Sequence, residues 1–339
     1  MAVGKSAINV VLGAMTIGKP GHEGIRVTSI DEVKNFFRIF RAHGHTEVDT
    51  ARVYGGGSTE EVLAAADWQG FGITMETKLY PTAGKGIGWM YADEISHTPA
   101  DVRRGLMQSL KALNADKIDT FYLHGPDRST PYEETLREVN ALHREGYFTR
   151  FGISNYQSWE VAQICEICRR NGWIMPTLYQ GLYNALHRVV EAELIPCLRH
   201  YGIALYVFNP LAGGFLTSRY HREQDDTAEE GSRFDPKRKQ GALHRGRYWN
   251  DAHFGALDLL RPVAAKHGIG EAEAALRWLA HHSALSKDKG DAVIVGASSS
   301  KHLEENLVAL EKGPLPDDVV EALNQGWELA RGLPLKYWH

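Results

Sequence analysis

The feature that most restricts the fold of this chain is a regular alternation between short apolar runs and longer amphipathic stretches. A short apolar run is typical of a buried strand, whereas an apolar stripe that returns about every three to four residues is typical of a helix. Strands that alternate with helices over most of a chain form a parallel sheet. The predicted strands cover residues 46–49, 73–78, 120–124, 149–154, 177–180, 204–209 and 292–297.

The amphipathic stretches predict helices between these strands. The first helix begins at Ser29-Ile-Asp-Glu32, which has the spacing of a capping box, and runs to about Ala42. The others cover residues 58–66, 99–113, 132–145, 157–171, 190–201, 251–267, 271–282 and 300–311. A further apolar run at residues 8–12 is either the first strand of the sheet or part of a hairpin that caps it.

A parallel sheet of this size is either a closed eight-stranded barrel or an open, doubly wound sheet. An open dinucleotide-binding sheet carries Gly-x-Gly-x-x-Gly after an early strand, and the sequence contains no such string. With the run at 8–12 there are eight strand candidates, and no linker divides the chain. We therefore predict one (β/α)8 TIM-barrel domain over residues 1–339, an α/β fold with an extended loop at 212–250 on its functional face.

The composition argues against nucleic acids and membranes as partners. Lys and Arg number 38 and Asp and Glu 42, which gives a formal net charge of −4, and no apolar run is long enough to cross a bilayer. The three cysteines are an odd set in a long chain, which favours a reducing compartment such as the cytoplasm. Cys165 and Cys168 lie in a predicted helix without a second pair, and no His-Glu-x-x-His string occurs, so we expect no metal site.

Ionisable side chains stand at the ends of three consecutive predicted strands. Asp49, Lys78 and His124 end the strands at 46–49, 73–78 and 120–124, and Tyr54 follows Asp49 by five residues. In a (β/α)8 barrel the carboxyl ends of the strands form the active site. Each side chain alone has an ordinary structural explanation, but the four groups at one mouth share none, so together they indicate catalysis.

These four groups suit the reduction of a carbonyl compound. A hydride that reaches a carbonyl carbon leaves negative charge on the oxygen, so a proton donor must be close. The Tyr54 phenol can donate this proton, and the Lys78 ammonium would lower the phenol's pKa from its ordinary value of about 10. Asp49 would keep Lys78 charged and in place, and His124 would orient the carbonyl oxygen.

Four motifs contain these residues or adjoin them: Asp49-Thr-Ala-Arg-Val-Tyr54, Glu76-Thr-Lys78, Tyr122-Leu-His124 and Gly152-Ile-Ser-Asn155. Together they resemble the aldo-keto reductase superfamily, and the resemblance covers nearly the whole chain. Stretches at 154–160, 171–177, 179–184, 209–214 and 296–300 resemble its aflatoxin-aldehyde reductase branch, whose members also reduce succinic semialdehyde. The resemblance implies a barrel enzyme that reduces aldehydes or dicarbonyls to alcohols with NADPH.

The resemblance also implies where the nicotinamide and the pyrophosphate bind. Ser154, Asn155 and Gln180 match positions that bind the nicotinamide carboxamide, and Phe208 matches the aromatic residue on which the nicotinamide ring stacks. Glycines in the next loop let backbone N–H groups approach the pyrophosphate closely. The residues that match this loop are Asn209, Pro210, Leu211, Ala212, Gly213 and Gly214.

The adenosine end of the cofactor is implied in the same way. Arg219 and Arg233 match basic positions around the adenosine 2′-phosphate, and guanidinium groups suit a phosphate, so we expect NADPH rather than NADH. His302 departs from the glutamine that is common in relatives. The remaining adenosine contacts match Ser298, His302, Glu305 and Asn306.

The substrate pocket departs from the relatives at two positions. Members that reduce acidic aldehydes use one arginine that Arg247 matches and a second arginine where this sequence has His339; His244 stands where relatives have a tyrosine. Arginine binds a carboxylate with two hydrogen bonds, whereas histidine is mostly neutral at pH 7. With His124, Arg247 and His339 as substrate contacts, we expect a weaker preference for carboxylated aldehydes than in those relatives.

Other functions stay open from the sequence. The chain could be a secondary-metabolism reductase with a changed substrate, or a cofactor-sensing regulatory subunit with little turnover, whereas a metal-dependent hydrolase lacks ligands. The expected partner is a small carbonyl compound. The oligomeric state is open, although the resemblance implies a homodimer by analogy.

Overall fold

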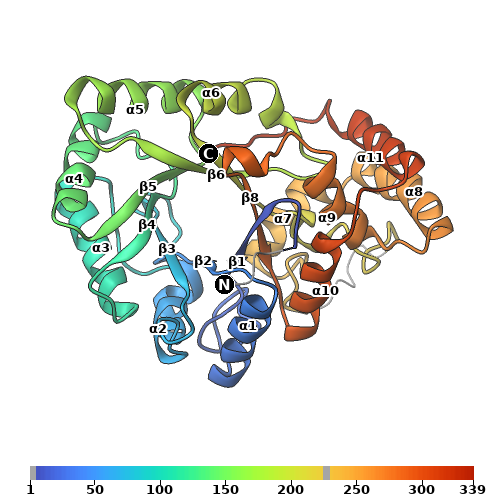
Figure 1. Ribbon diagram of the computed structural model, residues 1–339, viewed down its shortest axis with the longest axis horizontal. Helices are drawn as coiled ribbons and strands as arrows, with labels where there is room; N and C mark the ends of the chain where they lie inside the picture. Colours follow the sequence, from blue (N-terminus) through green and yellow to red (C-terminus); the bar gives the residue numbers. More distant parts are fainter. Residues whose placement is uncertain (1–4, 224–229) are drawn as a thin grey trace.

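Eight parallel strands close into a barrel that helices surround, as Figure 1 shows for the computed structural model, which describes residues 5–223 and 230–339. Each strand pairs in parallel with the next, and β1 pairs with β8. The predicted (β/α)8 fold is confirmed, and the run at 8–12 belongs to a barrel strand. The strands are β1 Asn9–Gly13, β2 Glu47–Asp49, β3 Thr74–Leu79, β4 Ile118–Leu123, β5 Phe148–Ser154, β6 Pro176–Leu182, β7 Ala204–Phe208 and β8 Ala292–Gly296.

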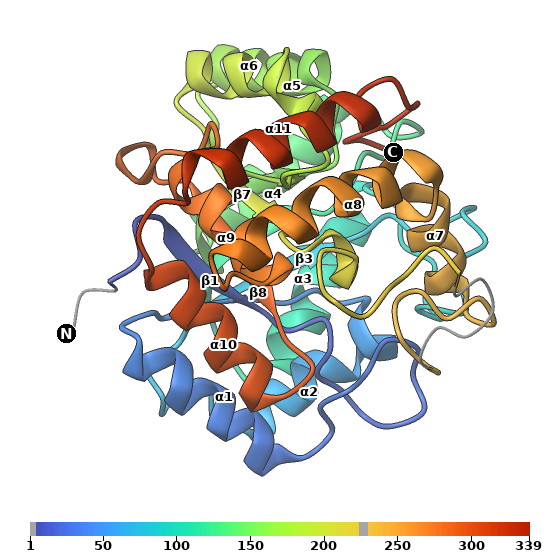
Figure 2. The same ribbon diagram turned by 90° about the vertical axis from the view of Figure 1, so that its right-hand side faces the viewer.

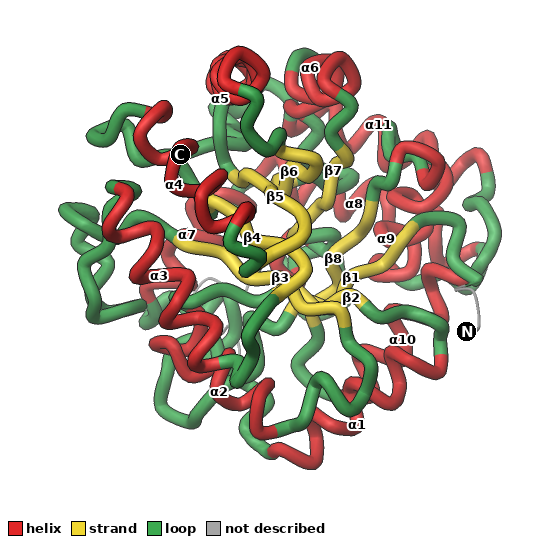
Figure 3. Tube along the Cα trace, turned by 60° about the vertical axis from the view of Figure 1, so that its left-hand side comes forward, coloured by secondary structure: helices red, strands yellow, loops and turns green. Residues whose placement is uncertain are grey.

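The helices lie outside the ring of strands (Figure 3), and most of them bury an apolar face against the barrel or against a neighbouring helix. The α-helices are α1 Ile30–Ala42, α2 Ser58–Ala65, α3 Pro99–Ala112, α4 Tyr132–Arg144, α5 Ser158–Asn171, α6 Leu194–Tyr201, α7 Lys239–Tyr248, α8 Asp251–Lys266, α9 Glu271–His281, α10 Ser300–Glu311 and α11 Asp317–Ala330. Short 3-10 helices are η1 Tyr54–Gly57, η2 Val189–Glu191, η3 Ala212–Gly214 and η4 Lys287–Lys289. None of the helices in the described part of the chain is both long and apolar enough to cross a membrane.

Two helices were not predicted. The prediction of a loop at 212–250 is wrong for residues 239–248, which form α7; residues 224–229 of that segment lie outside the described residues. Helix α7 buries Gln240, Gly241 and Tyr248 rather than an apolar stripe, so its pattern does not indicate a helix. Helix α11 runs beside α8 (Figure 2), and its Gly326 allows this close contact, since a Cβ there would lie 2.8 Å from the Cβ of Ala256.

The predicted capping box at the start of α1 does not form. The side chain of Ser29 makes no capping hydrogen bond. Glu32 instead accepts hydrogen bonds from the backbone N (2.9 Å) and the hydroxyl (2.8 Å) of Ser300. The acid of the predicted box therefore joins α1 to the start of α10 instead of capping its own helix.

The interior of the barrel is filled by side chains and supports the site at one end. The ring of Tyr122 lies over Gly152, where a Cβ would come within 2.2 Å of the ring. Below it, Arg150 donates hydrogen bonds to Asp119 at 2.6 Å and to Glu47 at 2.8 Å. These contacts close the end of the barrel where the strands begin, and the active site of a (β/α)8 barrel lies at the opposite end, where the strands finish.

Candidate active site

The structure brings Asp49, Tyr54, Lys78 and His124 together at the carboxyl ends of β2, β3 and β4. The Nζ atom of Lys78 lies 2.5 Å from Oδ1 of Asp49 and 5.0 Å from the centre of the Tyr54 ring. The rings of Tyr54 and His124 meet edge to face, with their centres 5.8 Å apart. Tyr54 reaches this cluster because it opens η1, directly after the turn that follows β2.

Lys78 and Asp49 form a buried ion pair. Lys78 also donates to the backbone oxygen of Thr50 at 2.8 Å, and the amide of Gln180 donates to Oδ1 of Asp49 at 2.7 Å. Burial opposes the charge of Lys78, but Asp49 and Tyr54 outweigh it, so the pKa of Lys78 is raised above its ordinary value. The ammonium is therefore charged at neutral pH and held in one position.

The pKa of Tyr54 is shifted in the direction opposite to the prediction. Burial raises this pKa, and the Asp49 carboxylate adds to the effect, while the Lys78 ammonium lowers it. The net result is a raised pKa, because the loss of water around the phenol outweighs the nearby cation. Lys78 acts on Tyr54 in the expected sense, but it offsets burial rather than making the phenol more acidic than free tyrosine.

His124 is a neutral imidazole in this site. Burial and the charge of Lys78 hold its pKa well below the ordinary value. Its Nδ1 atom is buried and has no hydrogen-bond partner among the described residues. The backbone oxygen of His124 accepts a hydrogen bond of 2.8 Å from the amide of Asn155, which joins the end of β4 to the end of β5.

A buried ion pair behind the site fixes the loop that carries Tyr54. Arg52 pairs with Glu60, and its Nη2 donates to the backbone oxygen of Gly57 at 2.6 Å. Thr77, next to Lys78 on β3, donates to Glu60 at 2.5 Å. Sequence reasoning missed Arg52 and Glu60, because nothing in their spacing separates a buried pair from charges on a solvated loop.

Aromatic and basic residues form a wall beside His124. The ring of Tyr80 lies 5.4 Å from His124 and 5.8 Å from His339, and Nζ of Lys85 lies 4.7 Å above Tyr80. Burial, followed by the charges of Lys85, Arg247 and Arg128, lowers the pKa of His339 to about 4. His339 is thus a neutral part of the wall, and Tyr80 and Lys85 are residues that the sequence analysis did not single out.

Comparison with known proteins identifies the family. The model of the Aldo/keto reductase family matches residues 9–328. The chain belongs to this family. Its relatives include Aldo-keto reductase pigE of Monascus ruber, which is 52% identical over 99% of this chain and 98% of that protein. Human Aldo-keto reductase family 7 member A3 is 44% identical over 94% of this chain and 93% of that protein. Human Aflatoxin B1 aldehyde reductase member 4 is 43% identical over the same shares.

Beside the four groups, the reductase has a polar rim that contains the residues expected to bind the nicotinamide. Ser154, Asn155 and Gln180 stand at or next to the ends of β5 and β6, and the amide of Asn155 donates to the Ser154 hydroxyl at 3.0 Å. Phe208 ends β7 and is partly exposed. In the loop that follows, Gly213 has φ +72° and its Cα faces His244, where a Cβ would come within 2.4 Å of the imidazole. Glycine is therefore required at this position both by the positive φ and by the imidazole that lies against it.

The two arginines expected at the adenosine 2′-phosphate lie in different places. Arg219 Nη2 is 3.3 Å from Nε2 of His302, whose Nδ1 is 2.9 Å from the Ser298 hydroxyl. Arg233 instead reaches Oδ1 of Asn209 at 3.3 Å and acts on the pKa of Tyr54. Arg233 thus lies close enough to the reacting end to act on Tyr54, and the expectation that it binds the 2′-phosphate together with Arg219 stays a prediction.

The remaining residues expected at the adenosine and at the substrate lie on α10 and α7. Asn306 is buried in α10, and Glu305 lies on the same helix, where its carboxylate is 3.8 Å from Lys301. Arg247 lies over the ring of Tyr248, 6.0 Å from its centre; burial is the main reason why the pKa values of His244 and His339 are lowered, and the charge of Arg247 adds to this effect. In the described part of the chain, no group of three or more His, Cys, Asp or Glu side chains is arranged to hold a metal ion.

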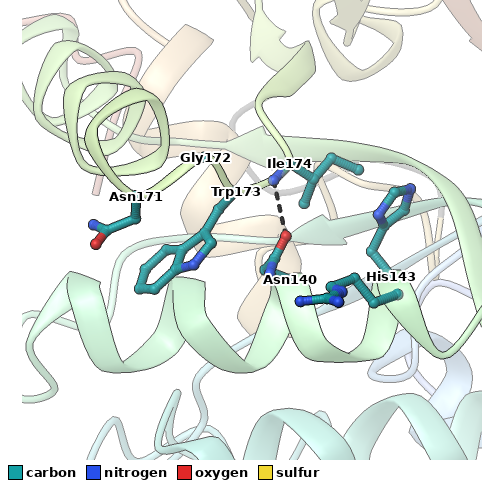
Figure 4. A pocket seen from close by; sticks show the side chains of 7 residues that line it. Asn140, His143, Asn171, Gly172, Trp173 and Ile174 are labelled. Atoms are coloured by element: carbon teal, nitrogen blue, oxygen red, sulfur yellow. Dashed lines mark hydrogen bonds between the residues drawn. The ribbon is translucent and has the colours of Figure 1, made fainter.

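A surface hollow of about 460 Å³ is lined by none of these residues, and Figure 4 shows it from close by. It is formed where α4 and α5 end, which is the side of the barrel where strands begin, and the Asn140 side chain accepts a hydrogen bond of 3.0 Å from the backbone of Ile174 there. The lining residues are Asn140, His143, Arg144, Asn171, Gly172, Trp173 and Ile174. The hollow therefore takes no part in the site.

Proposed function

We propose that this aldo-keto reductase reduces aldehydes or dicarbonyls to alcohols with NADPH, and that Tyr54 is the proton donor. The observation that carries the proposal is the buried Asp49–Lys78 pair, whose ammonium stands 5.0 Å from the Tyr54 ring at the end of the barrel where active sites lie. When bound, NADPH supplies the hydride that adds to the carbonyl carbon.

The protein's own residues handle the charge that develops on the carbonyl oxygen. Tyr54 gives its O–H proton to that oxygen as the charge appears, and the phenolate left behind is stabilised by the Lys78 ammonium. Asp49 keeps the ammonium in place. His124, which is neutral, donates a hydrogen bond that orients the oxygen toward Tyr54.

The choice of NADPH rests on the adenosine end. Arg219, His302 and Ser298 are joined by contacts of 3.3 and 2.9 Å, and this set of donors suits a 2′-phosphate, which NADH lacks.

Substrate choice rests on the wall beside His124. Because His339 is neutral, Arg247 is the proposed anchor for a carboxylated aldehyde, and neutral aromatic or dicarbonyl substrates should compete well.

The test is NADPH oxidation at 340 nm with a panel of neutral, acidic and dicarbonyl substrates. The wild type should turn over several of them, and Tyr54→Phe should lose turnover while its NADPH affinity, followed by tryptophan fluorescence, stays within about twofold. Near-normal turnover by Tyr54→Phe would reject the assignment of the acid. Tight NADPH binding without turnover of any substrate would instead favour a cofactor-sensing subunit.

A further inference from the structure

His244 on α7 has a buried nitrogen atom that the proposed reaction does not use. Its Nδ1 lies 3.0 Å from the backbone oxygen of Gln240, which can only accept, so Nδ1 carries the hydrogen. Its Nε2 is therefore a bare acceptor in the neutral ring. Nε2 is buried and has no hydrogen-bond partner among the described residues. A buried polar atom without a partner is costly, which raises the question of what binds there.

This nitrogen lies next to the backbone of the loop at residues 209–214, which we call the glycine loop. A Cβ built on Gly213 would lie 2.4 Å from Cδ2 and 3.0 Å from Nε2 of His244, so the imidazole rests directly on the loop. On its other side the ring meets Phe234 edge to face, with centres 5.8 Å apart. His244 is thus held between an aromatic side chain and the loop expected to receive the pyrophosphate.

The charged groups around His244 are cations. Arg233 and Arg247 both act on its titration, and together with burial, the largest cause, they lower the pKa of His244 to about 3. Arg233 makes its contacts with Oδ1 of Asn209 and Sδ of Met15, and in the described ranges no carboxylate pairs with it. A partly buried guanidinium without a carboxylate partner, beside an imidazole whose protonation it opposes, favours the binding of an anion there.

We propose that His244 takes up a proton from solvent on Nε2 when the pyrophosphate of the nucleotide binds the glycine loop, and then donates a hydrogen bond to a phosphate oxygen. The inference rests on the proposed use of a nicotinamide nucleotide. The proton comes from hydronium or from a buffer acid, whose bond to that proton breaks as the N–H bond forms on the ring. The resulting imidazolium and Arg233 then balance the two negative charges of the pyrophosphate.

Electrostatics explain why nucleotide binding should raise the proton affinity of His244. The two negative charges of the pyrophosphate offset Arg233 and Arg247, which oppose protonation in the empty site, and a phosphate oxygen gives Nε2–H an acceptor. The imidazole therefore holds a proton more tightly with the nucleotide bound than without it. Nucleotide affinity should rise as the pH falls from about 7.5 to about 6, because protons and nucleotide bind together.

Isothermal titration calorimetry tests this proton uptake directly. NADP+ is titrated into the protein at pH 6.5 in two buffers of different ionisation enthalpy, which gives the number of protons bound per nucleotide. The wild type should take up at least about half a proton more than His244→Gln, and the variant should bind NADP+ about 10-fold more weakly at this pH. His200→Gln, which replaces an exposed imidazole on α6, should behave like the wild type.

A second ligand separates the pyrophosphate from the 2′-phosphate. 2′-AMP carries only the latter, so its proton count should be the same in the wild type and in His244→Gln. Equal proton counts for NADP+ in the two proteins would overturn the inference while leaving the proposed function intact. A difference that also appears with 2′-AMP would overturn it too, whereas failure of NADP+ to bind the wild type would reject the proposed function itself.

Discussion

Lys78 is the residue on which the proposed chemistry depends most, because it is the cation that offsets the effect of burial on Tyr54. Lys78→Met removes this charge and leaves Asp49 buried without its partner. We expect kcat to fall at least about 100-fold, with a smaller change in NADPH affinity. The pH dependence of the reverse reaction, alcohol oxidation, should move to higher pH, since the phenolate form of Tyr54 becomes harder to reach; an unmoved profile would contradict this role.

Arg219 should determine the choice between NADPH and NADH. Its guanidinium lies with His302 and Ser298, away from the reacting groups. Arg219→Ala should weaken NADPH about 10- to 100-fold, the effect of losing hydrogen bonds to a charged group, and leave NADH nearly unchanged. Dissociation constants measured by fluorescence check this. Arg222→Ala is the matched control, since Arg222 is an exposed arginine paired with Asp251 and Asp258; equal losses in the two variants would contradict the assignment.

For single residues, the sequence predicts which side chains meet at the site, but it does not predict how deeply they are buried or what surrounds them. Asp49, Lys78 and His124 could be placed together because parallel strands end at the same rim of a barrel. The raised pKa of Tyr54 could not be predicted, because it depends on how much water the folded chain excludes. Tyr80 was missed for a related reason: its contacts with His124 and His339 join segments distant in sequence.

The 3-10 helix η1 is the element that positions Tyr54, the proposed proton donor, and Gly57 ends it with φ +92°. A Cβ at Gly57 would lie 2.3 Å from Nη2 of Arg52. Gly57→Ala should therefore cost about 1–3 kcal/mol of backbone strain and, in addition, displace Arg52 from Glu60. We expect a lower melting temperature and a loss of kcat.

Gly172→Ala provides the comparison for this change. Gly172 follows α5 with φ +64°, and a Cβ placed there would have no atom of the described residues within 4 Å beyond its chain neighbours. That variant should suffer backbone strain alone and keep its kcat. If both variants lost stability equally and both remained active, the Arg52–Glu60 pair would not position Tyr54.

Among the elements, the regular barrel units could be predicted and the additions to them could not. The helices between strands carry clear apolar stripes, so their positions are confirmed to within a few residues. Helix α11 has such a stripe at Val319, Ala322 and Leu323, but it lies beyond the last strand–helix unit and was overlooked. Helix α7 has no stripe, because it packs through Gly241 against the backbone of Asp235.

For the molecule as a whole, buried histidines predict a loss of stability in mild acid. Burial lowers the pKa of His187 and of the half-buried His244 to about 3, and of His45, His97 and His253 to about 4. Between about pH 6.5 and 4 the unfolded chain binds protons that the folded chain does not, so the free energy of unfolding must fall as the pH falls. His43 acts in the opposite direction, since Glu311 and Glu304 overcome burial and raise its pKa.

The melting temperature should therefore drop steadily from pH 7 to pH 4.5. Differential scanning calorimetry over this range checks the prediction. The decline should begin near pH 6.5, where free histidine titrates, and not only below about pH 4.5, where carboxylates do. A melting temperature that stays constant down to pH 5 would contradict it.

The buried pair of Arg52 and Glu60 has a consequence for how the protein responds to heat. Because Glu60 also binds Thr77 on β3, the segment bearing the phenol is tied to the barrel, and we expect it not to open before the barrel unfolds. Warming should leave the catalytic groups assembled until the barrel itself melts. Heat inactivation and the loss of circular dichroism should then follow one curve, and the enzyme should work at its full rate almost up to the temperature at which it unfolds.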